Sequence, residues 1–184
     1  MSGRFVAWFV TVFVGMLALL GSVGFAISRV IVSQPRELYR GPAFEFDLAP
    51  GWSCQTEGTE DVCYPAGSKP HAAIAVIAIK RRNDQDNLQA YEDHLRQPQK
   101  AGDRSKEGGQ LSEVRFVRRR TLGGREWVEG LHVGSEIANF HTYYLATATS
   151  HIGMLVTMSV HKDRATEYVD ELAAMMSSLN TYQR

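Results

Sequence analysis

Six histidines are the residues of this chain that could bind a metal ion or transfer a proton near neutral pH. No two of them stand four residues apart, the spacing that places two rings on one helix face, and none belongs to a tight ligand cluster. His141 and His161 fall on neighbouring predicted strands, and a turn centred on residue 151 would place them directly opposite each other. This pair is the one candidate metal site, although a surface or core role is the commoner one for such histidines.

Cys54 and Cys63 are the only cysteines. They lie in the segment WSCQTEGTEDVCYP, in which strands at 52–56 and 61–65 around a tip at 57–60 place them opposite each other. Cysteines paired in this way are within reach of a disulfide bond, which persists in an oxidising compartment. The alternative is two buried thiols that only pack, and the spacing does not suit a zinc site. We therefore expect a disulfide and a domain outside the cytoplasm.

Catalytic motifs are absent from the sequence. No Gly-x-Ser-x-Gly elbow occurs, and Gly123-Gly124 is followed by neither Lys-Ser nor Lys-Thr, so it is a turn and not a phosphate loop. The carboxylates Glu57, Glu60 and Asp61 belong to the tip of the cysteine hairpin, where solubility is their expected role and weak cation binding the alternative. We expect no enzymatic activity and no bound cofactor.

Two basic groups stand out. One is Lys80, Arg81 and Arg82 at the end of a predicted strand, and the other contains Arg118 and Arg120 on one face of a later strand. If these segments meet, they form a patch for anionic headgroups or an acidic partner; otherwise they are solvated. The chain has 20 basic and 20 acidic residues, and this balance excludes a typical nucleic-acid binder.

Residues 5–28 carry no charge. A helix of this length is about 36 Å long, whereas the hydrocarbon core of a bilayer is about 30 Å thick. The sequence therefore predicts a transmembrane signal-anchor helix at 5–32; a signal peptide cleaved after Ala26 is the alternative. Four small residues recur at spacings of three and four, and this predicted helix-packing face would allow another membrane helix to approach closely. They are Gly15, Ala18, Ser22 and Ala26.

Two features of the sequence disagree about the orientation of the predicted anchor in the membrane. Arg4 precedes the apolar segment, whereas Arg29, Arg36 and Arg40 follow it, and this asymmetry favours a cytoplasmic domain. The predicted disulfide favours the opposite side of the membrane. Giving more weight to the disulfide, we expect a single-pass protein of the inner cell membrane whose C-terminal domain lies outside the cytoplasm, in the periplasm.

A tether at 33–43, which contains Pro35 and Pro42, leads to one predicted domain at 44–182. The run AAIAVIAI at 72–79 is typical of a strand buried on both faces, and Asp86 or Asn87 can cap a helix. This pattern predicts an α+β fold, with a mostly antiparallel sheet and helices on its faces. The predicted strands are 44–48, 52–56, 61–65, 72–79, 111–122, 125–133, 139–149 and 152–161, and the predicted helices are 86–97 and 163–179.

The segment from Phe44 to Trp52 (FEFDLAPGW) resembles the opening strand and Pro-Gly-Trp turn of the PsbP-like family, named for an extrinsic subunit of photosystem II. The resemblance continues through the strand at 72–79, Trp127, Tyr143-Tyr144 and the closing strand and helix. It implies an α/β/α sandwich that acts by binding, often without enzymatic activity. The chain departs from the family in its transmembrane helix, where many relatives carry a lipidated cysteine or a transit peptide, and in its cysteine hairpin.

These observations lead to two expectations for function. The first is a non-enzymatic accessory subunit, in which one membrane helix docks in a larger membrane protein complex and the domain caps or stabilises it. The alternative is a free-standing anchored binding domain for a ligand or envelope component. An enzyme that uses a metal or carboxylates is the remaining class. The expected partners are the lipid bilayer and other membrane subunits.

Overall fold

The computed structural model describes Met16 and residues 37–67, 71–99, 111–135 and 140–182. The predicted anchor at 5–32 and its packing face (Gly15, Ala18, Ser22 and Ala26) therefore lie outside the described residues, except for Met16. Residues 1–36 and 37–184 are separate compact units. Within the described ranges, no helix combines the length and the apolar composition needed to cross a membrane.

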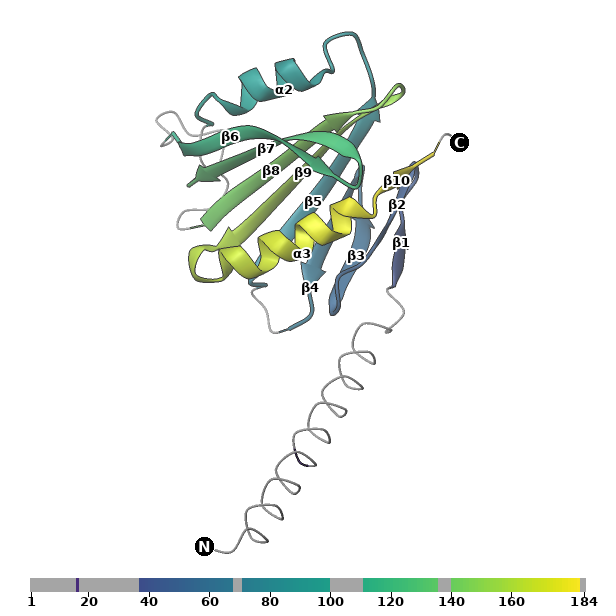
Figure 1. Ribbon diagram of the computed structural model, residues 1–184, viewed down its shortest axis with the longest axis vertical. Helices are drawn as coiled ribbons and strands as arrows, with labels where there is room; N and C mark the ends of the chain where they lie inside the picture. Colours follow the sequence, from purple (N-terminus) through teal and green to yellow (C-terminus); the bar gives the residue numbers. More distant parts are fainter. Residues whose placement is uncertain (1–15, 17–36, 68–70, 100–110, 136–139, 183–184) are drawn as a thin grey trace, which may run out of the picture. The chain divides into compact units, whose positions relative to one another are not determined.

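The second unit is built on a seven-stranded sheet in the order β3-β4-β5-β9-β8-β7-β6 (Figure 1). All of its described pairings are antiparallel. Most neighbouring strands also follow one another in the chain, as antiparallel hairpins allow, whereas β5 leads to β6, at an edge of the sheet, through the segment that contains α2. Its strands are β3 (Trp52–Glu57), β4 (Glu60–Pro65), β5 (Ala73–Arg81), β6 (Glu113–Leu122), β7 (Arg125–Val133), β8 (Phe140–Ala148) and β9 (Ile152–His161).

A smaller sheet stands beside the large one. It contains β1 (Leu38–Arg40), β2 (Phe44–Asp47) and β10 (Asn180–Thr181), with β2 in the middle. Strand β1 falls inside the segment 33–43 that was expected to be only a tether. It forms there because its backbone pairs with β2 in a short hairpin, as Tyr39 opposite Phe46, although Pro35 and Pro42 favoured an unpaired segment.

Helix α3 (Ala165–Ser177), which follows a short 3-10 turn at Lys162–Arg164, covers one face of the large sheet. Its apolar stripe and the small sheet enclose the main core, because alternate strand residues point to this side. The largest fully buried side chains of this core include Phe44, Phe46, Trp127, Met158, Leu172, Met175 and Met176. The predicted α+β fold with a mostly antiparallel sheet is therefore confirmed.

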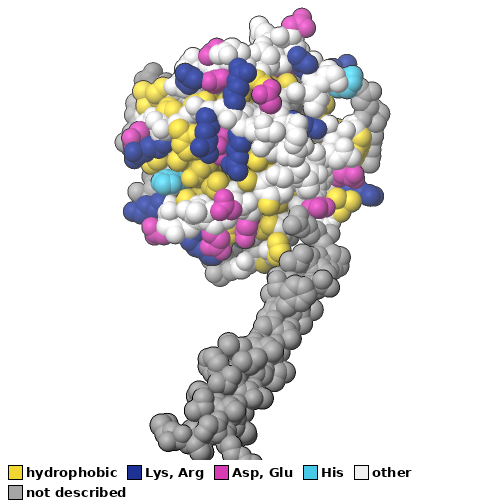
Figure 2. All heavy atoms as spheres, viewed as in Figure 1, with side chains coloured by type: hydrophobic (Ala, Val, Ile, Leu, Met, Phe, Trp, Pro, Cys, Tyr) yellow, Lys and Arg dark blue, Asp and Glu magenta, His cyan; other side chains and the backbone are white. Residues whose placement is uncertain are grey.

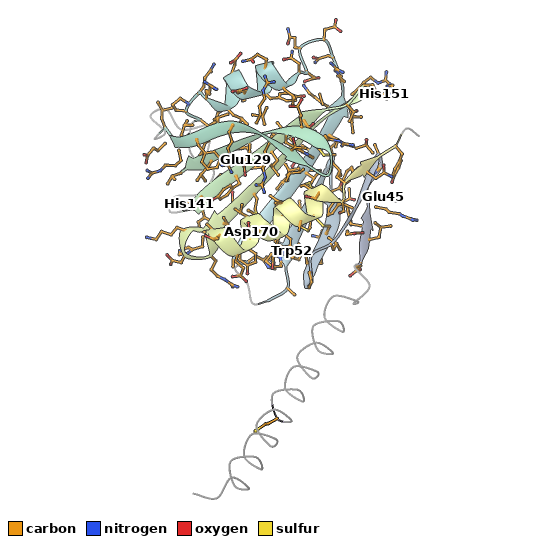
Figure 3. The ribbon with its side chains drawn as sticks, in the orientation of Figure 1. Glu45, Trp52, Glu129, His141, His151 and Asp170 are labelled. Atoms are coloured by element: carbon orange, nitrogen blue, oxygen red, sulfur yellow. A yellow bond between two sulfur atoms is a disulfide. The ribbon has the colours of Figure 1, made fainter. Side chains whose placement is uncertain are left out.

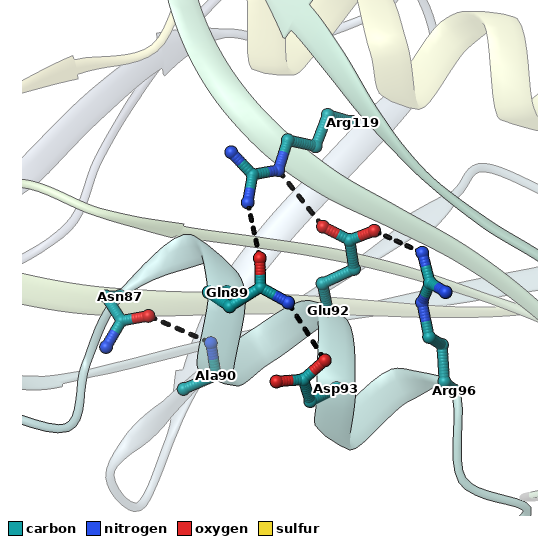
Figure 4. Close-up of polar contacts among 7 residues, drawn as sticks. All are labelled: Asn87, Gln89, Ala90, Glu92, Asp93, Arg96 and Arg119. Atoms are coloured by element: carbon teal, nitrogen blue, oxygen red, sulfur yellow. Dashed lines mark hydrogen bonds and ion pairs between the residues drawn. The ribbon is translucent and has the colours of Figure 1, made fainter.

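Helix α2 (Leu88–Leu95) lies on the opposite face, where Leu95 packs with Val128 and Tyr144 in a second, smaller cluster. Asn87 caps it by accepting a hydrogen bond from the Ala90 backbone at 2.9 Å, which confirms one of the two predicted caps (Figure 4).

Arg119 of β6 ties this helix to the sheet edge (Figure 4). Its Nε donates to Glu92 and its Nη2 to Gln89, each at 3.0 Å. The same Glu92 carboxylate accepts from Arg96, and the neighbouring guanidinium groups hold the pKa of Glu92 below its usual range. Charged contacts at the surface thus hold α2 against β6.

Cys54 and Cys63 are opposite each other in β3 and β4 and form a disulfide, as the hairpin pattern predicts. Replacing both with alanine should lower the free energy of unfolding by about 2.5–3 kcal/mol, because the disulfide restricts the conformational entropy of the unfolded chain. Urea unfolding of the full chain in neutral detergent measures this loss. Reduction of the wild-type protein should give the same loss, and an unchanged unfolding midpoint would contradict the prediction.

Candidate binding groove

A groove with a volume of 1080 Å³ lies on the face of the sheet that carries α2. The helix packs over β6, β7 and β8, and it leaves much of β5 and β9 without a helical cover. The groove runs along these two strands. Its floor is therefore the part of a sheet face that the domain does not use for its own core.

The floor is mainly apolar. On β5, Ala73, Ala75 and Ile77 point into the main core and are buried, whereas Ile74 and Val76 face the groove and stay half-buried. The expectation that this strand is buried on both faces is thus wrong for the groove side. The reason is the position of α2, which packs on β6, β7 and β8 and leaves this part of β5 uncovered.

Leu155 of β9 lies in the middle of this floor and is 38% exposed. It pairs with Ala78 of β5 on one side and with Ala146 of β8 on the other. Because both neighbours are small, they leave the leucine side chain partly exposed. A partner that covers this large apolar side chain removes it from water, and this burial favours binding.

One wall of the groove is α2, through Tyr91 and Leu95, continued by Pro98. Tyr91 lies close against β9 because residue 153 is glycine: a Cβ atom there would be 2.6 Å from the tyrosine oxygen. Gly153 therefore sets the position of this wall.

A polar network closes one end of the groove. Asp86 is 2% exposed and accepts from the Lys80 ammonium at 2.7 Å and from the Tyr91 hydroxyl at 3.0 Å. The Lys80 contact and the Asn83 backbone N–H hold the pKa of Asp86 below its usual range. Burial, together with the hydrogen bond to Asp86, raises the pKa of Tyr91 to about 12. The tyrosine thus stays protonated and donates to the carboxylate.

This network predicts a dependence of stability on pH. Because the folded protein lowers the pKa of Asp86, its stabilisation is complete above the ordinary value of 3.8 and is lost as the pH falls through the lower pKa. The difference in unfolding free energy between wild type and Asp86→Asn should therefore shrink between about pH 4 and pH 2. Urea unfolding across this range measures it, with Asp93→Asn on the exposed side of α2 as the control. A difference that stays constant with pH would contradict the assignment.

The histidine pair expected on β8 and β9 is not opposed. His141 pairs with Val160, and His161 pairs with Phe140, so the two histidines lie on opposite faces of the sheet (Figure 3 labels His141). The turn is centred between Ser150 and His151, half a residue before the expected centre at residue 151. Each residue of β8 therefore pairs with the residue of β9 one position earlier than expected. In the described ranges, no three His, Cys, Asp or Glu side chains gather into a group that could hold a metal ion.

His132 has a structural role that sequence reasoning did not assign. It is fully buried, and its Nε2 donates to the Leu95 carbonyl at 2.8 Å, while Nδ1 accepts from the Ser112 hydroxyl at 3.1 Å. Burial lowers the pKa of His132, which favours this neutral form. The ring therefore anchors the C-terminal end of α2 against β7.

The two basic groups do not form one patch. Strands β9, β8 and β7 separate β5 from β6, so Lys80–Arg82 and the Arg118 group are about 19 Å apart at a strand spacing of about 4.8 Å. Acidic and basic side chains are interspersed over the face viewed in Figure 2.

Arg118 and Arg120 instead hold a buried carboxylate. They contact Glu129 of β7, which is 3% exposed, at 2.6 and 3.0 Å (Figure 3 labels Glu129). Burial of Tyr143 raises the pKa of its hydroxyl, and the negative charge of nearby Glu129 raises this pKa further. These arginines neutralise a side chain of their own domain.

No protein-family model matches the chain, and no curated protein matches it by sequence. Several solved structures resemble it. LpqN of Mycobacterium tuberculosis, described as involved in cell envelope biogenesis, has a TM-score of 0.53 at 11% identity, over 82% of this chain and 87% of LpqN. The cyanobacterial PsbP of Synechocystis sp. PCC 6803 has a TM-score of 0.52 at 12% identity, over 79% of this chain and 92% of that protein.

A third similar structure is the Ran-binding protein Mog1p of Saccharomyces cerevisiae, with a TM-score of 0.50 at 12% identity over 81% of this chain and 96% of Mog1p. At such identities these likenesses show the fold alone. The predicted PsbP-like fold is thereby confirmed for the domain, and the proteins that share it differ in what their descriptions say of them.

Proposed function

We propose that this chain is a non-enzymatic accessory subunit of a membrane protein complex, and that its domain binds an apolar segment of another subunit in the groove over β5 and β9. The observation that carries the proposal is the half-exposed apolar floor at Ile74, Val76 and Leu155. Contiguous apolar surface of this kind marks interaction sites in water-soluble domains.

The proposed location is the outer side of the inner membrane, with the apolar segment at 5–32 as the anchor. Three observations support it. The Cys54–Cys63 disulfide is of a kind that persists in oxidising compartments, and one protein of similar fold, LpqN, is described as involved in cell envelope biogenesis. The uncharged segment at 5–28 is long enough to span the bilayer.

The test is extraction of native membranes with a mild detergent, followed by native gel separation and mass spectrometry of the band that contains this chain. We expect migration in a large complex with membrane proteins in fixed stoichiometry. A band of the chain alone would overturn the subunit proposal. It would favour the alternative, a free-standing anchored domain that uses the groove for a ligand or an envelope component.

A further inference from the structure

A second hollow lies at the end of the sheet where β5 stops and β8 turns into β9. Its volume is 760 Å³, and four segments distant in sequence form its walls: 42–43, 79–82, 149–152 and 181–182. Its lining includes Lys80, Arg81, Arg82 and His151, and it contains no aspartate or glutamate. Figure 3 labels His151 at this end of the domain. The hollow therefore concentrates positive charge.

Two of these cations have no carboxylate partner among the described residues. Arg82 donates from Nε to the Asp86 carbonyl at 3.1 Å and from Nη1 to the Thr149 carbonyl at 2.8 Å, so neutral groups hold its guanidinium in place. Arg81 is exposed, and its side chain forms no hydrogen bond or ion pair within the described residues. Lys80 differs, because Asp86 already neutralises it.

A third guanidinium lies behind the wall. Arg125, the first residue of β7, donates from Nη2 to the Thr181 hydroxyl at 3.3 Å, and Thr181 lines the hollow. Its Nη1 is buried and has no hydrogen-bond partner in the described part of the chain. Burial lowers the pKa of Arg125, because a buried cation without a counter-ion is less stable in its charged form.

We propose that this hollow binds a phosphate group, either as free phosphate or as part of a lipid headgroup. Guanidinium groups present forked donors that match the oxygens of phosphate, and bonds between such ionised partners are the strong ones. Arg81 supplies an exposed donor group without a partner among the described residues, and Arg82 supplies one that backbone carbonyls hold in place. A bound anion would also offset the uncompensated charge of Arg125. The site is distinct from the groove: Lys80 and Ile79 line both hollows, whereas Arg81 and Arg82 line only this one.

The test is isothermal titration of the full chain, in neutral detergent at low salt, with two probes. The first is inorganic phosphate, and the second is dioctanoyl phosphatidylglycerol. Arg81→Gln should raise the dissociation constant for the phosphate-bearing probe about tenfold, which corresponds to about 1.4 kcal/mol. The matched control is Arg115→Gln, because Arg115 is an exposed arginine of β6 paired with Glu113; it should leave binding unchanged.

The probes distinguish the sources of the phosphate. Saturable binding of inorganic phosphate, with no tighter binding of the lipid, identifies a free phosphate site; much tighter binding of the lipid identifies a headgroup site. Ser150→Asp, in the exposed turn, places a carboxylate at the rim and should abolish binding without depending on Arg81. Absence of saturable binding of either probe would overturn the proposal. Equal loss in Arg81→Gln and Arg115→Gln would overturn it as well.

Discussion

Gly123→Ala should destabilise the domain more than any other single-methyl change at a turn of this protein, by about 2–4 kcal/mol. Gly123 begins the two-residue turn between β6 and β7 with a φ of 56°, a conformation that disfavours side chains. A Cβ atom there would lie 2.0 Å from the backbone oxygen of Ser177, at the end of α3. The turn and the helix end must therefore move apart, which opens the main core near Leu122. Urea unfolding of the full chain measures the effect.

The neighbouring glycine provides the control. Gly124 has a φ of 75° in the same turn, but a Cβ atom there meets nothing within 4 Å. The free energy of unfolding of Gly124→Ala should therefore fall only by the cost of backbone strain, about 1 kcal/mol. If both variants lose the same amount, the close packing of α3 against this turn is contradicted.

If the groove binds another subunit as proposed, Leu155→Glu should remove the chain from that complex, with an apparent affinity for the partner at least tenfold lower. Covering an exposed leucine contributes about 1.5–3 kcal/mol, and a glutamate in the same place would have to lose its hydration against an apolar floor. Quantitative native gels of mild detergent extracts measure the fraction of the chain that remains in the complex. The folded state should change little, because Leu155 already faces the open groove.

Leu38→Glu is the matched control for this variant. Leu38 is 43% exposed, similar to the 38% of Leu155, but it belongs to β1 of the small sheet. It should leave the complex intact. Loss of the complex in both variants, or in neither, would contradict binding through the groove.

The sequence predicted the large sheet, its hairpins and the disulfide because these depend on local patterns. Strands 52–56 and 61–65 share a short tip, so the register that opposes Cys54 and Cys63 follows from counting. The same counting failed at His141 and His161, because an error of half a residue in the turn centre exchanges the faces of a strand.

The groove and the hollow could not be predicted in this way. The pattern of β5 is apolar on both faces, and only the position of α2 decides that Ile74 and Val76 stay half-exposed. The hollow joins Arg81 to His151 and Thr181, which are distant in sequence and meet only at the end of the folded sheet. The sequence predicts the basic triplet as a group and places Arg125 with the second basic group, but it does not predict that Arg125 is buried, because that burial depends on contact with β10 through Thr181.

The most direct test of the account is site-specific photocrosslinking in intact cells, from a photoreactive residue at position 155 and from one at position 38. If the groove binds another subunit, position 155 should give one defined adduct with a membrane protein that also migrates with the chain on native gels, and position 38 should not. No adduct from position 155, or the same adduct from both positions, would contradict the account.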